Sequence, residues 1–254
     1  IIMRAGTVED TEFTNGRILV TAVQDFFGLA DSGYSETPDR GWTPPDNLPV
    51  APDPVVVMEA NWRDLAATLS NSDLAAFPDD SGALVTLAAQ PNGTAVYYDL
   101  ATAATGESVQ VRAQGDWTPN AVLAADVGVY DTLLTFVAGS DLTEAQAGEA
   151  LLLGDEIMAI DAVNTGTLEI TVRRGCADTI PQPHAAAGVA WFYEDFSGTD
   201  GRDYTDGEVL DVRFMTVTSS SRMEVADAAS NAYTITARAF RPYPPGDVKA
   251  GGDP

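Results

Sequence analysis

Short apolar runs separated by turn residues dominate the middle of this chain of 254 residues. The runs TLLTFVA, EALLLG, EIMAIDAV, LEITVR and GVAWFY follow one another between residues 132 and 193, and β-branched and aromatic side chains are frequent in them. Turn residues lie between the runs, among them the acidic turn Gly154-Asp155-Glu156 and the turn Asn164-Thr165-Gly166. Short strands with turns about every 8–12 residues are typical of a β-sandwich or a barrel. We therefore predict a small β-barrel module over residues 121–195.

Similar runs lie on both sides of this module. They are VVVMEA (55–60), ALVTLAAQ (83–90), TAVYYDLA (94–101), SVQVRAQGDW (108–117), EVLDVRFMTVTS (208–219) and NAYTITARAF (231–240), with a further run, RILVTAVQDFF, at residues 17–27. Asn92-Gly93 between two alternating runs predicts a β-hairpin. Asn61 is suited to cap a helix in which Trp62, Leu65, Ala66 and Leu69 share a face, and a second short helix is expected over residues 72–77.

These patterns predict a mainly β fold of small β-barrel or sandwich domains with one short helical patch at residues 60–77. We expect residues 1–120 to form a β domain with a proline-rich arm over residues 28–54. Residues 196–254 would complete that domain and end in a linker rich in proline and glycine. Because residues 83–120 and 197–241 both contain strand segments that can pair, we expect the barrel to be inserted between two halves of one domain.

The charge of the chain limits its partners. Asp and Glu number 38 against 13 Lys and Arg, which gives a formal net charge of −25. A surface of this sign repels nucleic-acid phosphates and anionic membranes, so we expect neither to be bound by this chain. No apolar run is long enough for a transmembrane span. Since Cys176 is the only cysteine, we expect no intrachain disulfide and no cysteine-based metal site.

Several short motifs occur in a fixed order along nearly the whole chain. They are GRI (16–18), VQDFFG (23–28), GWTPP (41–45), WRDL (62–65), YYDL (97–100), GDEI (154–157), RGCADT (174–179), HAAAG (184–188), GEV (207–209) and RPYPPG (241–246). This order resembles the tail-tip or baseplate-hub proteins of long-tailed bacteriophages and of related gene transfer agents. Members of that family are often several times larger, which leaves a fragment of a longer hub or a shortened standalone version. We favour the fragment, because neither end of the sequence has the signals of a natural terminus.

The resemblance implies a structural role at the tail tip of a virion, after assembly in the host cytoplasm. Such proteins form a ring, commonly a trimer, and contact the tail tube or distal tail, the tape measure, fibres and a host surface receptor. It implies no enzymatic activity and no cofactor. Prolines reduce the entropy that an arm loses on docking. We therefore predict that the arm, with Trp42, Pro44 and Pro45, crosses to an adjacent subunit.

Residues at the turns of the barrel are the candidates for catalysis. His184 is the only histidine, but no G-x-S-x-G elbow accompanies it, so we expect a structural turn residue and keep a hydrolase as an alternative. Asp155 and Glu156 are adjacent and would point to opposite faces of a strand, which argues against an acid/base pair. We predict a barrel corner of Asp155, Glu156, Arg174 and His184, with Glu156 pairing either Arg173 or Arg174.

The acidic and the aromatic residues suggest two further classes of ligand, calcium and sugars. Asp200, Asp203, Asp206 and Glu208 could supply oxygens to calcium, but the EF-hand spacing is missing, so a solvated loop is favoured. Stacking of aromatic rings on sugars is the basis of the alternative function, a receptor- or glycan-binding module of the tail tip. The rings considered for it are Tyr34, Trp42, Tyr97, Tyr98, Trp191, Phe192 and Tyr193. Cys176 is expected to be a small buried apolar residue.

Overall fold

The computed structural model describes residues 3–5, 22–24 and 47–241, and it divides the chain into two units at residues 46 and 47. In the first unit, strands β1 (Met3–Ala5) and β2 (Ala22–Gln24) pair in antiparallel fashion, and Met3 lies opposite Gln24. Strand β2 falls within the run predicted as a strand over residues 17–27. The predicted arm residues Trp42, Pro44 and Pro45 lie outside the described residues, so their proposed crossing stays a prediction.

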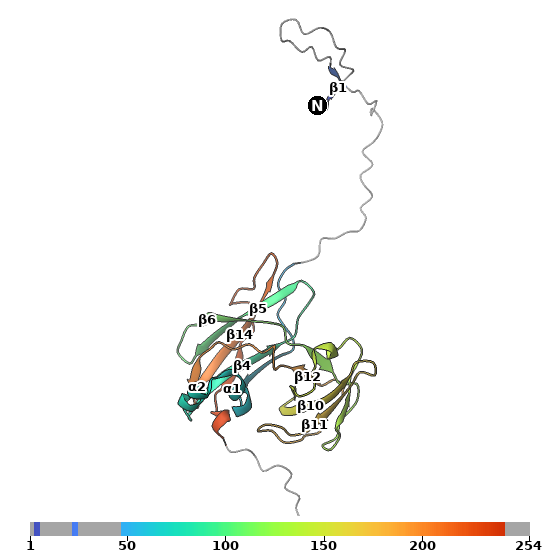
Figure 1. Ribbon diagram of the computed structural model, residues 1–254. Coiled ribbons are helices and arrows are strands. Elements are labelled where there is room, and N and C mark those ends of the chain that lie inside the picture. The colour runs from blue at the N-terminus through green and yellow to red at the C-terminus, as the bar shows by residue number, and fades with distance from the viewer. Residues whose placement is uncertain (1–2, 6–21, 25–46, 242–254) are drawn as a thin grey trace, which may run out of the picture. The chain divides into compact units, whose positions relative to one another are not determined.

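The second unit is mainly β, as the sequence predicts, with three antiparallel sheets and two short helices (Figure 1). A three-stranded sheet has the order β13-β4-β3, with β3 (Val55–Glu59), β4 (Ser81–Ala88) and β13 (Asp203–Thr205). A four-stranded sheet has the order β15-β14-β5-β6, with β5 (Ala95–Ala104), β6 (Gln110–Gly115), β14 (Val209–Thr218) and β15 (Asn231–Thr234).

The third sheet curves into a half-barrel with the strand order β7-β12-β9-β10-β11-β8. Its strands are β7 (Asn120–Val122), β8 (Leu133–Thr135), β9 (Ala150–Leu153), β10 (Glu156–Asn164), β11 (Glu169–Arg173) and β12 (Val189–Phe192). An isolated bridge between Leu123 and Phe136 joins the two outer strands, with Ala124 N–H donating to Thr135 C=O at 2.9 Å. All of these strands lie between β6 and β13 in the sequence, whereas β5 pairs with β14 along most of its length.

The predicted hairpin at Asn92-Gly93 is wrong. Strand β4 pairs with β3 and β13, whereas β5 pairs with β14 and β6, so the turn connects two different sheets. A two-residue type I′ hairpin needs positive φ at both central residues, and neither Asn92 nor Gly93 has it. Instead the Asn92 side chain accepts hydrogen bonds from the backbone N–H groups of Thr94 and Ala95, which turns the chain toward the facing sheet.

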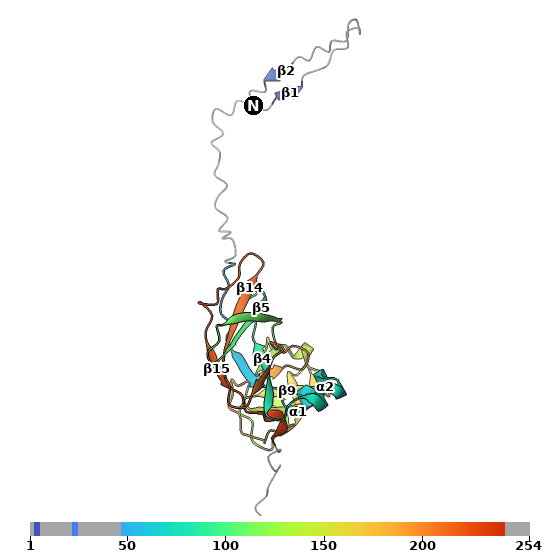
Figure 2. The same cartoon turned by 90° about the vertical axis from the view of Figure 1, so that its left-hand side faces the viewer.

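Strand β4 is buried on both faces, which explains its nearly unbroken apolar sequence. Leu84 and Ala88 pack against Leu100 and other residues of the four-stranded sheet, whereas Val85 and Leu87 belong to a second core. That second core contains Leu65 of α1 (Trp62–Thr68) and side chains of the half-barrel. In Figure 2, β4 correspondingly lies between β15 and the two helices. The three-stranded sheet is thus the middle layer of the unit.

The helical patch begins at a capping box. Asn61 accepts a hydrogen bond from the backbone of Asp64, whose carboxylate accepts from the backbone of Asn61. The second helix, α2 (Asn71–Ala76), begins one residue earlier than predicted because Ser70 caps it. Leu65 is buried, whereas Ala66, predicted on the same face, is exposed. Trp62 contacts Phe240 of the short 3₁₀ helix η2 (Arg238–Phe240) with ring centroids 5.6 Å apart.

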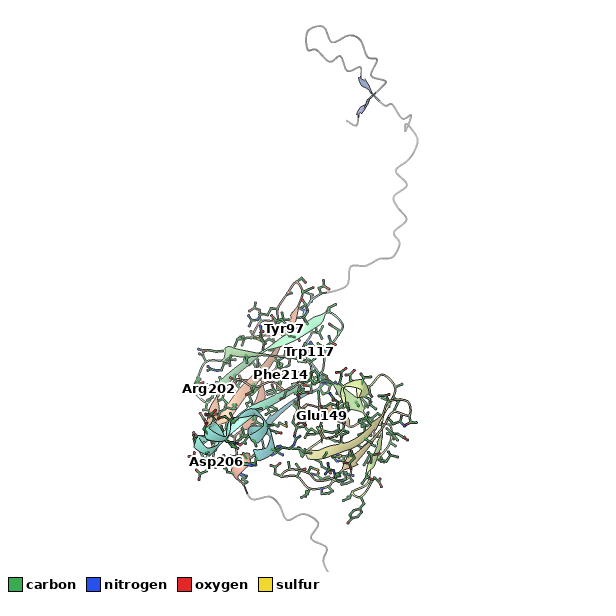
Figure 3. All side chains as sticks on the ribbon, viewed as in Figure 1. Tyr97, Trp117, Glu149, Arg202, Asp206 and Phe214 are labelled. Carbon is green, nitrogen blue, oxygen red and sulfur yellow. The ribbon has the colours of Figure 1, made fainter. Side chains whose placement is uncertain are left out.

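Tyr98 of β5 lies at the centre of the core between the three- and four-stranded sheets. Its ring is fully buried and packs against Trp117 and Phe214, each with a centroid distance of 5.3 Å. Figure 3 labels Trp117 and Phe214 in this core. Two glycines approach Tyr98 closely: a Cβ added at Gly115 would lie 2.2 Å from the Tyr98 ring, and one at Gly198 would lie 2.5 Å from the Tyr98 hydroxyl. These positions accept no side chain because the ring has no room to move.

We therefore expect Gly115→Ala to lower the free energy of unfolding by about 1–3 kcal/mol, the usual cost of overpacking. Gly93→Ala is the matched control, because a Cβ there meets no heavy atom within 4 Å. The control should change the stability by no more than about 0.5 kcal/mol. Urea unfolding followed by tryptophan fluorescence measures both, and equal effects of the two substitutions would contradict the packing around Tyr98.

Candidate functional site

The barrel corner is organised around Glu156, the first residue of β10. Its side chain is fully buried, and it accepts five hydrogen bonds. Arg174 donates two of them, at 2.8 and 2.7 Å, and His184 Nε2 lies 2.8 Å from Oε2. The backbone N–H groups of Gly175 and Gln182 donate the other two, at 2.9 and 3.0 Å. A buried carboxylate is thus compensated by a bidentate guanidinium and by backbone dipoles.

Local turns bring Glu156 to this position. Strands β9 and β10 form a hairpin with Leu153 opposite Glu156, and Gly154 in the connecting turn has φ of +59°, a conformation that favours glycine. Asp155 lies in this turn and is exposed, so it is not part of the cluster. Of the four residues predicted for the corner, the structure brings together Glu156, Arg174 and His184. It pairs the neighbouring Arg173 with Asp161 at 2.9 Å, on the surface.

Arg174 extends the network to two loops. Its Nη1 donates to the carbonyl oxygens of Gly128 and Asp131, at 2.7 and 2.8 Å. Its Nη2 donates to the carbonyl oxygen of Gln182 at 2.6 Å as well as to Glu156. The guanidinium therefore holds the loop that precedes β8 and the loop that precedes β12 against β10.

The environment shifts the titration of Glu156. Burial by itself raises the pKa of this carboxyl, whereas the hydrogen bonds from Arg174, His184, Gln182 and Gly175 lower it, and the net result is a pKa below the ordinary value. The ionised form is therefore the one that the fold stabilises.

The lowered pKa of Glu156 predicts how the stability of the fold depends on pH. A carboxyl with a lowered pKa in the folded state stabilises the fold above its unfolded pKa, about 4.3, and loses this contribution as the pH falls through the folded-state pKa. We expect the stability difference between the unsubstituted protein and Glu156→Gln to be largest near neutral pH and to shrink below about pH 4. Urea unfolding at a series of pH values tests this, and a difference independent of pH would contradict it.

The contacts of His184 are structural. The ring is mostly buried. Within the described residues, its Nε2 atom forms a hydrogen bond with the carboxylate of Glu156. Its backbone also pairs with Val127 in an isolated bridge. A Ser-His-Asp arrangement needs the histidine between a carboxylate and a nucleophile. Among the described residues, the other polar partners in this corner are Arg174 and backbone groups, so the corner holds loops together.

The four carboxylates considered for calcium have different surroundings in this fold. Asp200 is buried and accepts hydrogen bonds from Thr102, at 2.6 Å, and from the hydroxyl of Tyr204. Glu208 accepts from the backbone of Thr205 at 2.8 Å, while Asp203 and Asp206 are exposed. Throughout the described residues, no group of three or more His, Cys, Asp or Glu is placed to hold a metal ion. Asp200 thus serves as a buried acceptor, and Glu208 caps a turn.

The cluster around Asp200 is a second polar centre, and it is structural as well. Burial and the hydrogen bond to Asp200 raise the pKa of Tyr204 to about 12. Arg202 lies over the Tyr204 ring, 5.0 Å from its centroid, and pairs with Glu107 at 2.8 Å. Figure 3 shows Arg202 and Asp206 in the same part of the unit.

Most of the aromatic residues considered for sugar binding are core residues. Tyr98, Trp191, Phe192 and Tyr193 are buried, and Tyr97 is partly buried. Tyr34 and Trp42 lie outside the described residues. Cys176 is partly buried rather than fully buried, packs against the second core, and its thiol donates to the Arg173 carbonyl at 3.4 Å.

Sequence reasoning missed a further buried carboxylate, Glu59 at the end of β3. It is fully buried and accepts hydrogen bonds from the backbone N–H groups of Thr236 and Arg238, at 2.8 and 2.6 Å. A Cβ at Gly82 would lie 2.1 Å from Glu59 Oε1, so the glycine makes room for this side chain. The available signal was an acidic residue inside the apolar run VVVMEA. Arg238 also pairs with Asp178 of the half-barrel segment, which ties that segment to η2.

No protein-family model matches the chain, and no curated protein matches it. Among the described residues, no helix combines the length and the apolar character needed to cross a membrane.

Proposed function

We propose that this chain is a structural component of the tail tip or baseplate hub of a long-tailed bacteriophage. It would assemble through subunit interfaces at the distal end of the tail, with other copies of itself in a trimeric ring and with tube, tape-measure and fibre proteins. In this position it supports attachment to the host. The ordered motifs that resemble this family, together with the mainly β fold, support the proposal.

The observation that supports a structural role is the hydrogen bonding in the barrel corner. The only histidine of the chain and the buried Glu156 are engaged with each other, with Arg174 and with backbone groups of two loops. Their hydrogen-bonding capacity maintains the fold of the half-barrel. A protein that acts through surfaces rather than through a reaction centre fits this arrangement.

The four-stranded sheet offers one surface for assembly. Strand β6 is at its edge, and within the described residues it pairs only with β5. Such an edge has unpaired backbone groups that can add a strand of another chain. Val111 on this strand is also exposed.

Electron microscopy of particles labelled with a gold-coupled antibody against this chain tests the assignment. The label should lie at the distal end of the tail, and antibody absorbed beforehand with purified protein provides the control. Label on the capsid, or intact particles that lack the chain, would reject the proposal.

Self-association should increase with salt. Copies with a formal net charge of −25 repel one another, and raising the ionic strength from about 0.1 to 1 M shortens the Debye length from about 10 to 3 Å. Sedimentation equilibrium at both ionic strengths should show a larger mean mass at high salt. A mass that falls with salt would indicate that ion pairs between copies dominate assembly.

A further inference from the structure

An open groove lies on the outside of the half-barrel, next to the corner. It has a volume of about 720 Å³, and Val129, Tyr130, Ile180, Pro181 and Arg173 are among the residues that line it. Tyr130 is 80% exposed and Ile180 is 46% exposed, so two large apolar side chains leave much of their surface uncovered at the groove. Exposed apolar surface at a concave site is typical of a binding surface.

The corner network holds both walls of this groove. Arg174 binds the carbonyl oxygens of Gly128 and Asp131, which flank Val129 and Tyr130 in the sequence. The same guanidinium binds the carbonyl oxygen of Gln182, next to Pro181. The two loops that carry the apolar side chains are thus fixed before any partner arrives, which reduces the entropy lost on binding.

The charge around the groove indicates the kind of partner. Residues 121–193 contain ten Asp and Glu. Apart from His184, the only basic side chains in this segment are Arg173 and Arg174. Both arginines are already paired with carboxylates, Asp161 and Glu156. The charged residues that line the groove, Asp161, Arg173 and Arg174, are thus engaged in ion pairs, whereas the half-barrel segment as a whole has a net charge of −8 at neutral pH. A second copy of this chain has the same sign of charge and would be repelled, whereas a cationic segment would be attracted.

We propose that this groove binds a basic, apolar peptide segment of another protein. An aliphatic or aromatic side chain of that segment would pack against Tyr130 and Ile180, and its Lys or Arg side chains would face the acidic surface of the half-barrel. The proposal concerns this surface alone and does not depend on the assignment to a phage tail.

Selection of a random dodecapeptide display library on the full chain, at physiological ionic strength, tests the proposal. We expect the enriched peptides to combine Lys or Arg with large apolar residues. The double variant Tyr130→Ser/Ile180→Ser should weaken their binding about tenfold or more, as expected for loss of buried anchor residues. Because Tyr130 is 80% exposed and Ile180 is about half exposed, the double variant should lose little stability, and urea unfolding checks this.

Val96→Ser is the matched control, because Val96 is 57% exposed on β5, away from the groove. It should leave peptide binding unchanged. The proposal is overturned if no peptide is enriched, if the enriched peptides are acidic or uncharged, or if the groove variant binds as well as the control. Sedimentation that shows a dimer abolished by the groove variant would assign the groove to a second copy and would overturn it as well.

Discussion

Replacing Glu156 with glutamine is expected to lower the free energy of unfolding by about 3–5 kcal/mol, the usual effect of removing one partner of a buried ion pair. The substitution keeps the size of the side chain but leaves the buried Arg174 guanidinium without its counter-charge. The amide would also place a donor among the N–H groups of Gly175, Gln182 and Arg174. Urea unfolding at neutral pH, followed by circular dichroism, measures the loss.

Asp161→Asn provides the matched control on the same strand. Asp161 pairs with Arg173 at 2.9 Å, but both side chains are exposed to solvent, so this pair should contribute no more than about 1 kcal/mol. The two substitutions remove the same charge, and they differ in burial and in the number of hydrogen bonds lost. Equal effects would show that the corner is solvated and does not hold the half-barrel together.

Truncation of Leu151 and of Leu152 to alanine should each cost about 2–5 kcal/mol. Adjacent strand residues point to opposite faces, so one of them is normally exposed and tolerant. In β9 both are buried: Leu151 faces the core of the half-barrel, whereas Leu152 packs with Trp191 in the core shared with β4 and α1. The half-barrel therefore uses both faces of this strand for packing.

Strand β8 supplies the matched control pair. Leu134 is fully buried there, but its neighbour Leu133 is 50% exposed. Leu134→Ala should cost about as much as Leu151→Ala, whereas Leu133→Ala should stay within about 0.5 kcal/mol. Urea unfolding of the four variants compares them, and a tolerant Leu152→Ala would show that the half-barrel does not pack on the middle sheet as described.

The strands were predictable because their signal is local. The alternating runs gave strands within a few residues of the observed ones, for example β10 at Glu156–Asn164 and β14 at Val209–Thr218. The capping box at Asn61 and Asp64 is also encoded within four residues. Strand pairing was less predictable, since Asn92-Gly93 connects two facing sheets instead of two paired strands.

The barrel corner was predictable only in part. Turn chemistry and the lone histidine pointed to Glu156 and His184, but the sequence left Arg173 and Arg174 equally suitable as partners. Arg173 lies at the end of β11 and pairs with Asp161 on the surface. The side chain of the next residue, Arg174, is buried and pairs with Glu156. Glu59 was missed because its partners, Thr236 and Arg238, lie far along the chain.

The sequence by itself determined that the chain folds mainly as β-structure and that its surface is acidic, because alternation, turn residues and charge are properties of neighbouring residues or of the whole composition. Only the tertiary structure decided which sheet each strand joins, that β4 and β9 are covered on both faces, and that Arg174 is the residue that pairs with Glu156. Period-two alternation states which side chains share a face of a strand, but long-range packing determines what covers that face.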